Sequence, residues 1–361
     1  MKKLIYFIVM LLIFPFASCN ISKPEKVKIA KKKRQPNVIL MIGDGMGLSE
    51  VSSTFYYGNR KPNFSRFKEI GLNNTSSADK KITDSAASGT ALATGKKTYN
   101  GAIGLDADSL IVPNLVEVLS NLEYNTAIIA TSSITHATPA SFFAHVKQRK
   151  MEYDIAEQLP KTEVDFFAAG GLKYFTNRDD GKDILKSLVE NGFALNDTIN
   201  YHFDISKKYA YILAEDALPS MLDGRGEFLS EYTQHALNYL SMSDKPFFVM
   251  IEASQIDWGG HAKNADYLIS EMLDFDKTIG TVMDFAEQDA NTLVIVLADH
   301  ETGGFTLATD NGDYGKIKPT FCTGGHSTTL IPVFAFGPGA DNFKGIYENT
   351  NIFDKIIQIT E

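Results

Sequence analysis

The sequence predicts an α/β fold in which helices cover both faces of a central, mostly parallel sheet. Three observations carry this prediction: several short apolar runs are continuous, helical patterns lie between them, and polar residues directly follow several of the runs. Continuous apolar runs are typical of strands that are buried on both faces. Alternation of strands with helices favours parallel pairing, and in such sheets binding sites form beyond the carboxyl ends of the strands.

Five apolar runs are predicted as strands: Val38–Ile42, Asn125–Thr131, Pro246–Glu252, Thr292–Ala298 and Ile331–Gly337. Five helical patterns accompany them: Asn114–Leu122, Ser141–Gln148, Asp183–Asn191, Glu231–Ser241 and Asp266–Glu287. Prolines precede the first two, and proline suits a helix start because its missing N–H has no partner there. Residues 150–235 carry no site motif, so we expect helices, loops and a cover over the site in that stretch.

The N-terminus has the composition of a secretory signal peptide. Two lysines precede the apolar run Leu4–Phe16, which is too short for a comfortable membrane span, and small residues then precede Cys19. Residues 1–19 resemble a bacterial lipoprotein signal peptide, in which the cysteine is lipidated and becomes the first mature residue. The alternative is ordinary secretion with Cys19 removed, because Phe16 stands where leucine is usual. We expect an exported protein, periplasmic or anchored to the outer membrane.

A polar segment at residues 20–35 separates this leader from the body of the chain. The segment is rich in lysine, and repulsion between like charges keeps such a segment extended. We therefore expect a basic tether there, followed by a single domain at 36–361. Only Cys322 remains in that domain, so an internal disulfide is excluded.

Charge is distributed unevenly along the chain. Residues 1–34 hold nine Lys/Arg and one acid, whereas the whole chain has a net charge of −9. The body is therefore strongly acidic, which argues against nucleic acid as a binding partner. An anionic substrate is not excluded, because bound divalent cations would dominate the field inside a site.

The motif GDGMG follows the first predicted strand and holds Asp44 between two glycines. The glycines also suit a nucleotide-binding turn, but the third glycine of that fingerprint is missing. A carboxylate in such a turn would face a pyrophosphate, whereas it suits a bound cation. Metal ligation is therefore the favoured interpretation of Asp44.

The segment TDSAASGTALATG has a Thr/Asp/Ser cluster at the start of a small-residue helix. One interpretation is that a residue of this cluster caps the helix. The other places Ser85 at the helix N-terminus, where free N–H groups and the dipole favour a phosphate. A serine hydroxyl needs a base or a metal to act as a nucleophile, and no histidine is its neighbour in sequence. The two interpretations are about equally supported by these residues alone.

Carboxylates and histidines recur beside glycines in the C-terminal half. Asp257 and His261 are four residues apart, which places them on one side of a helical turn, although Gly259-Gly260 makes a regular helix doubtful. Asp299-His300 follow a predicted strand, and His326 lies in GGHS. A single histidine of this kind is more often a core or loop residue. Three in the same context indicate a metal site.

Taken together, the segments TDSAASGTA, THATPASFFAH, EASQIDWGGH, ADHETGGF and GGHS resemble the alkaline phosphatase family over residues 37–358. The resemblance extends to its compact bacterial members, including the cold-adapted type. It implies a three-layer sandwich, a homodimer, and a metal-dependent phosphomonoesterase that releases an alcohol and inorganic phosphate from small phosphate monoesters.

The resemblance also implies a role for each matched residue. Ser85 corresponds to the nucleophile that becomes a phosphoserine, and Arg149 to the arginine that holds phosphate oxygens. Two zinc ions and one magnesium ion per chain are implied. One zinc would be held by Asp257, His261 and His326, the second by Asp44, Asp299 and His300, and the magnesium by Asp44, Thr138 and Glu252. From sequence alone, Arg149 could also be a surface helix charge.

Two positions depart from the best-known enterobacterial pattern. His136 stands where that pattern has aspartate, and Trp258 where it has lysine, so both are expected beside the metals and the phosphate. An imidazole weakens the negative field around the third ion, which leaves magnesium and a third zinc as alternatives. Trp258 either packs beside the leaving group or is only structural.

Other functions fit the sequence less well. Phosphodiesterases and phosphonate hydrolases of the same superfamily commonly have threonine as the nucleophile. Sulfatases need a Cys- or Ser-x-Pro-x-Arg motif, which does not surround Ser85. A mutase would need phosphosugars that are mostly cytosolic. A non-catalytic lipoprotein that binds metal or phosphate would be expected to lack the nucleophile or some ligands, yet all these positions are filled.

Overall fold

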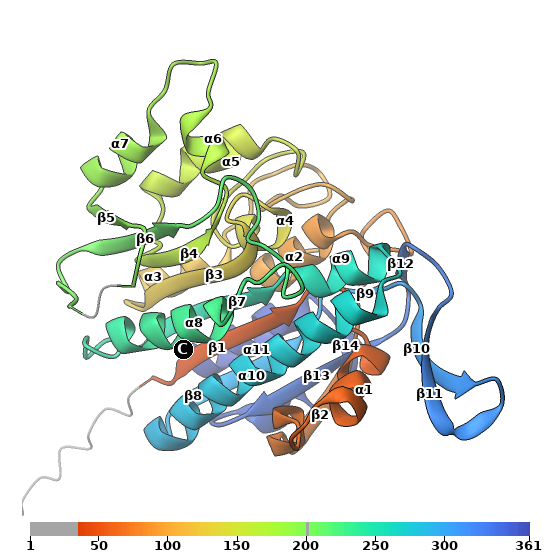
Figure 1. The fold of residues 1–361 in the computed structure, drawn as a ribbon. Coiled ribbons are helices and arrows are strands. Elements are labelled where there is room, and N and C mark those ends of the chain that lie inside the picture. The colour runs from red at the N-terminus through yellow and green to blue at the C-terminus, as the bar shows by residue number, and fades with distance from the viewer. Residues whose placement is uncertain (1–34, 200–201) are drawn as a thin grey trace, which may run out of the picture. The chain divides into compact units, whose positions relative to one another are not determined.

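A computed structural model of the chain describes residues 35–199 and 202–361 (Figure 1). Gln35–Glu361 forms one compact unit. The predicted signal peptide at 1–19 and all but the last residue of the predicted tether at 20–35 lie outside the described residues. Within the described ranges, no helix has both the length and the apolar character needed to cross a membrane.

A ten-stranded sheet forms the centre of the described structure, in the order β14-β2-β13-β8-β1-β7-β3-β4-β6-β5. Only β13 runs antiparallel to its neighbours in this sheet, so the predicted mostly parallel sheet is confirmed. The strands are β1 (Asn37–Gly43), β2 (Glu69–Asn74), β3 (Asn125–Ser133), β4 (Phe166–Gly170), β5 (Phe193–Asn196), β6 (Lys208–Ile212), β7 (Phe247–Ala253), β8 (Thr292–Leu297), β13 (Ile331–Phe336) and β14 (Gly345–Glu348).

Two apolar cores, one on each face of the sheet, place helices on both sides. Along β1, Val38, Leu40 and Ile42 belong to one core, and Ile39 and Met41 to the other, as expected because successive strand side chains point to opposite faces. Figure 1 shows α8 and α10 lying across one face of the sheet. The helices are α1 (Leu48–Tyr57), α2 (Ser85–Thr94), α3 (Leu115–Asn121), α4 (Ala137–Ala140), α5 (Glu152–Gln158), α6 (Lys173–Thr176), α7 (Ile184–Glu190), α8 (Phe228–Leu240), α9 (Gln255–His261), α10 (Ala265–Asp289) and α11 (Asn351–Thr360).

Smaller elements complete the fold near the carboxyl ends of the central strands. β9 (Glu301–Thr302) pairs with β12 (His326–Ser327), and between them β10 (Phe305–Asp310) and β11 (Asp313–Phe321) form a hairpin that projects from the body in Figure 1. The described residues also form three short 3-10 turns: η1 (Asn63–Arg66), η2 (Leu159–Lys161) and η3 (Ala340–Phe343).

The helix predicted at Ser141–Gln148 is wrong. The helical segment α4 ends before it, and the chain then forms turns in which Val146 pairs with Ile103. Phe142 and Phe143 are buried in the core beneath these turns. Tertiary burial, and not helical periodicity, therefore explains the apolar pattern.

The stretch 150–235 contributes more than the helices, loops and cover expected of it. It contains α5 to α8, but also β4, β6 and β5, which extend the sheet on one side. β2 and β14 were also missed at the opposite edge. β2, β5 and β14 have partly or largely exposed residues, so they lack the continuous apolar signal that marks the central strands. β4 and β6 are short apolar runs with buried centres, so the sequence did carry a signal for these two.

Candidate active site and metal centre

The predicted site residues come from loops and strand ends that meet at the carboxyl edge of the sheet. Asp44 directly follows β1, Glu252 is the penultimate residue of β7, and Asp299 and His300 follow β8. β1 lies between β7 and β8 in the sheet, so these three ends are neighbours. α9 carries Asp257 and His261 on one regular helical turn despite its two glycines.

Asp84 caps the start of α2, and Ser85 directs its hydroxyl toward the other site residues. The Asp84 side chain is the N-cap and accepts from the Ala87 N–H at 3.0 Å and from the Gly101 N–H at 3.1 Å. Ser85 is the first helical residue, and its Oγ lies 3.2 Å from Nε2 of His300. Because Asp84 supplies the cap, the Ser85 hydroxyl is left to face the other site residues.

Within residues 35–199 and 202–361, three groups of side chains have ligand atoms close enough to hold one ion each. The groups are Asp257/His261/His326, Asp44/Asp299/His300 and Asp44/His136/Glu252, and within each group the ligand atoms lie within 4.8 Å of one another. Asp44 belongs to two of them. The first two groups consist of the residues expected to hold one zinc each, and the third brings together Asp44 and Glu252 of the expected magnesium set with His136.

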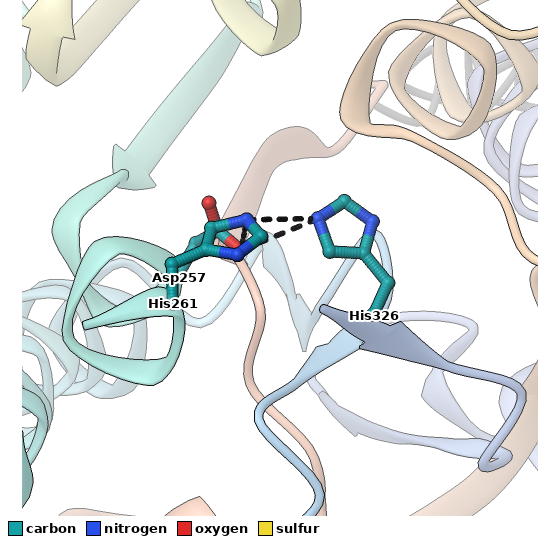
Figure 2. Close-up of side chains that lie close together, drawn as sticks. All are labelled: Asp257, His261 and His326. Carbon is teal, nitrogen blue, oxygen red and sulfur yellow. Dashed lines mark hydrogen bonds and ion pairs between the residues drawn. The ribbon is translucent and has the colours of Figure 1, made fainter. Parts of the chain in front are cut away.

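The first group presents two imidazole nitrogens to each other (Figure 2). Nδ1 of His261 lies 2.7 Å from the Gly324 carbonyl, and Nδ1 of His326 lies 2.8 Å from the Thr83 carbonyl. A carbonyl only accepts, so both Nδ1 atoms carry the proton when the rings are neutral. The two Nε2 lone pairs then face each other at 3.1 Å, with an Asp257 oxygen 3.3 Å from one and 3.6 Å from the other. Such an arrangement requires a positive charge between the rings.

Two nitrogens and a carboxylate oxygen form a donor set that suits zinc. The Nδ1 contacts to carbonyls are the usual way in which a zinc-binding histidine is oriented. The His261 side chain is 42% exposed, which leaves this position open toward solvent. The residues therefore fit a zinc ion with an open coordination position, the arrangement of catalytic rather than purely structural zinc.

The second group is buried and only partly compensated by hydrogen bonds, since Oδ1 of Asp299 accepts from the N–H groups of Gly45 at 3.2 Å and His300 at 2.9 Å. Asp44, Asp299 and His300 are fully buried, and among the described residues both Asp44 carboxylate oxygens and Oδ2 of Asp299 have no hydrogen-bond partner. Burial, and then repulsion from Asp299, hold the pKa of Asp44 well above its ordinary value, and burial raises the pKa of Asp299. Burial also holds the pKa of His300 well below its ordinary value, so the ring is neutral. Uncompensated buried carboxylates are costly, and a cation bound between them would remove the cost.

The third group combines Asp44 with Glu252 and His136. Glu252 Oε2 accepts from Ser132 Oγ at 3.2 Å and from Ser254 Oγ at 2.5 Å, while its Oε1 has no partner. Burial raises the pKa of Glu252 to about 7 and lowers the pKa of His136 to about 3.

Thr138 and His136 offer two further ligand atoms there. Thr138 Oγ1 and Nδ1 of His136 are both buried and have no hydrogen-bond partner in the part of the chain that the structure describes. Sequence reasoning placed His136 only near the ion, whereas the structure places its ring among the potential ligands. Oxygens with one imidazole suit magnesium or zinc.

Arg149 lies in a loop, so the alternative of a surface helix charge is wrong. Its Nη1 lies 3.4 Å from Oδ2 of Asp84, and its Nη2 lies 3.2 Å from Nε2 of His136. These contacts hold the guanidinium near the N-terminus of α2. The Trp258 ring meets the His136 ring edge-on, with 5.9 Å between centroids, so Trp258 contacts a potential metal ligand.

Sequence reasoning missed the hydroxyl and carboxylate groups that hold these side chains. Ser132 and Ser254 donate to Glu252, Thr302 Oγ1 donates to Asp257 at 2.5 Å, and Asp84 approaches Arg149. Ser254 and Thr302 each lie two residues from a predicted ligand, in EAS and HET. That closeness was the only available signal.

Comparison with known proteins gives a consistent result. The family model described as alkaline phosphatase matches residues 35–318. Alkaline phosphatase 4 of Bacillus subtilis (strain 168) is 30% identical, over 95% of this chain and 94% of the relative.

Solved structures agree in fold over nearly the whole described chain. The alkaline phosphatase from the Antarctic bacterium TAB5 is 54% identical, with a TM-score of 0.87 over 91% of this chain and 98% of the other. A variant of the TAB5 enzyme with a histidine replaced by aspartate is 53% identical, with the same TM-score and coverage, and is described with magnesium bound in its M3 site.

Proposed function

The chain belongs to the alkaline phosphatase family and is a phosphomonoesterase, and from this premise we propose that it acts through a phosphoserine intermediate on Ser85. One observation carries the proposal most directly. The hydroxyl of Ser85, at the start of α2, lies 3.2 Å from the Nε2 of His300, within reach of the second group of potential ligands.

The residues around Ser85 suit the transfer of a phosphoryl group. The first N–H groups of α2 and the helix dipole favour the negative charge of a phosphate. Arg149 adds a planar fork of donors that matches two phosphate oxygens. Attack by Ser85 Oγ forms an O–P bond while the bond from phosphorus to the alcohol oxygen breaks. Water then cleaves the phosphoserine and releases inorganic phosphate.

We assign two zinc ions and one magnesium ion to the three groups. Asp257, His261 and His326 would hold one zinc, and Asp44, Asp299 and His300 the other. Asp44, Thr138 and Glu252 would hold the magnesium, with His136 beside it. When bound, such ions stabilise negative charge on the reacting oxygens and lower the proton affinity of hydroxyl and water. Magnesium at the third position is supported by the oxygen donors of Asp44, Thr138 and Glu252.

We also propose that the protein is exported, lipidated at Cys19 and dimeric. Mass analysis of the native protein tests the first two, because lipidation adds fatty acyl mass to a chain that begins at Cys19. Light scattering at micromolar concentration tests the homodimer. A chain that retains residues 1–19 would contradict processing, and a monomeric mass would contradict the dimer.

One assay separates the proposed reaction from its relatives. The purified protein, supplied with zinc and magnesium at mildly alkaline pH, is given a nitrophenyl phosphate monoester, the matching diester and the sulfate ester. We expect strong preference for the monoester. Preference for the diester or the sulfate would contradict the assigned specificity, and no turnover of any ester would revive the binding-protein interpretation.

A further inference from the structure

Thr302 is a buried residue that touches elements from both proposed zinc sites. It lies in β9, directly opposite His326 of β12, and its side chain is fully buried. Its N–H donates to the carbonyl of Gly45, one residue after Asp44. A Cβ placed on Gly260 of α9 would come within 2.7 Å of the Thr302 carbonyl, so the two segments are tightly packed.

The Thr302 hydroxyl contacts one ligand from each site. Oγ1 lies 2.5 Å from Oδ1 of Asp257 and 3.2 Å from Nδ1 of His300. An ionised carboxylate can only accept, so the single hydroxyl proton points to Asp257. The hydroxyl oxygen is then free to accept, and Nδ1 of His300 is positioned to donate to it.

This direction of hydrogen bonding determines which nitrogen of His300 is available to a metal. With the proton on Nδ1, the lone pair of His300 is on Nε2. That Nε2 lies 3.2 Å from Ser85 Oγ and 3.2 Å from Asp299 Oδ2, inside the second group. The same hydroxyl restrains the Asp257 carboxylate in the first group.

We propose that Thr302 is a positioning residue that orients a ligand in each of the two zinc sites and so links their affinities. This inference rests on the proposed function only for the identity of the ions. One hydroxyl acts on a carboxylate and an imidazole that belong to different groups. Hydrogen bonds to metal ligands commonly change metal affinity by about 10 to 100-fold.

The test replaces the hydroxyl without changing the shape of the side chain. Thr302→Val is compared with the unaltered protein and with Thr302→Ser by titrating the zinc-loaded proteins with a chelator. We expect Thr302→Val to release zinc from both sites at a free-zinc concentration about 10 to 100-fold higher than the unaltered protein. Thr302→Ser keeps the hydroxyl and should remain within about 3-fold.

Thr278→Val is the matched control. Thr278 is also fully buried, but its hydroxyl donates to the carbonyl of Asp274 inside α10. Its loss should leave zinc affinity unchanged. Zinc retention by Thr302→Val equal to that of the control, or weakening at only one site, would overturn the link between the sites.

The tautomer of His300 gives an independent measurement on the unaltered protein. Nitrogen NMR of histidine-labelled, metal-free protein should show His300 protonated at Nδ1. Because this experiment uses the unaltered protein, it remains informative even if Thr302→Val fails to fold. Protonation at Nε2 would overturn the proposal. The chelator titration measures zinc affinity and the NMR experiment measures a protonation site, so neither depends on the ester assay. A protein that binds zinc as described but hydrolyses no monoester would contradict the proposed function without contradicting the proposed role of Thr302.

Discussion

At the residue scale, the site depends on side chains that are unfavourable without ions. Two imidazole lone pairs face each other at 3.1 Å, and the carboxylate oxygens of Asp44 are buried without a donor. In an ordinary core such groups would be replaced by apolar residues or would find partners. Their presence here indicates a site that suits bound cations better than it suits the stability of the metal-free chain.

Replacing Ser85 by alanine should remove the nucleophile and leave the ligand sets intact. We expect no phosphoenzyme and a fall in turnover of about 1,000-fold or more, with two zinc ions still bound. Acid quenching with labelled substrate measures the phosphoenzyme, and elemental analysis measures the zinc. Ser52→Ala is the control, since that hydroxyl donates to the Leu48 carbonyl within α1. Retained turnover would exclude Ser85.

At the element scale, the site is assembled where helices and loops follow parallel strands. The strands β1, β3, β7, β8 and β13 were predictable because each is a continuous buried run. β14 was not, because three of its four residues are exposed. Whether such a segment pairs depends on neighbours that are distant in sequence.

The contrast between local sequence patterns and contacts between distant residues also explains which site residues could be predicted. Asp257, His261 and His326 carry a recognisable donor pattern beside glycines. Thr302 does not, since threonine is common and its role depends on meeting Asp257 across 45 residues of sequence. Tertiary proximity of this kind is not encoded in local spacing.

Substituting Gly45 would test how tightly the loop after β1 is packed against α9. Its φ is +77°, and an added Cβ would lie 2.7 Å from the Asp257 Cα. Gly45→Ala should therefore displace Asp257 and weaken zinc binding, in addition to a conformational cost of about 1 kcal/mol.

Gly312→Ala is the matched control for that substitution. Gly312 has a φ of +79°, but an added Cβ would meet nothing within 4 Å. It should show the conformational cost alone, with normal zinc affinity by chelator titration. Equal zinc affinities for the two variants would show that the close approach is unimportant.

At the scale of the whole molecule, metal binding and folding are coupled. A ligand present at 1,000 times its Kd stabilises the folded state by about 4 kcal/mol, so removing all three ions should cost at least that much. The raised pKa values of Asp44, Asp299 and Glu252 mean that the contribution of these three carboxyl groups to the stability of the metal-free fold falls as pH rises above about 4, where they ionise in the unfolded chain. The difference in unfolding free energy between the metal-loaded and the metal-free protein, which we call the stability gap, should therefore widen toward alkaline pH.

Chemical denaturation with and without a chelator, at several pH values, measures this gap. Zinc plus magnesium should restore the lost stability. Asp299→Asn removes one of the charges, so its metal-free form should lose less stability as pH rises. A gap that stays constant with pH would contradict the electrostatic origin.

His235 predicts a separate loss of stability in acid. Burial lowers its pKa to about 4, and Tyr211 Oη lies 2.8 Å from its Nε2. The unfolded chain binds a proton near pH 6.5, so the contribution is fully present above that value and is lost as pH falls toward 4, by about 3 kcal/mol in total. Comparing metal-free unaltered protein with His235→Phe isolates this effect. Identical slopes for the two proteins between pH 4 and 6.5 would contradict it.

The unequal exposure of the ligands has a kinetic consequence. His261 reaches solvent, whereas Asp299 and His300 are fully enclosed. An ion at the outer position can leave with few obstacles, but one at the inner position can leave only after the side chains that enclose it move. Ions should therefore enter in a fixed order, inner before outer, and depart in the reverse order. In surroundings where zinc is scarce, many molecules would therefore hold an ion at the inner position while the outer, more exchangeable position is empty.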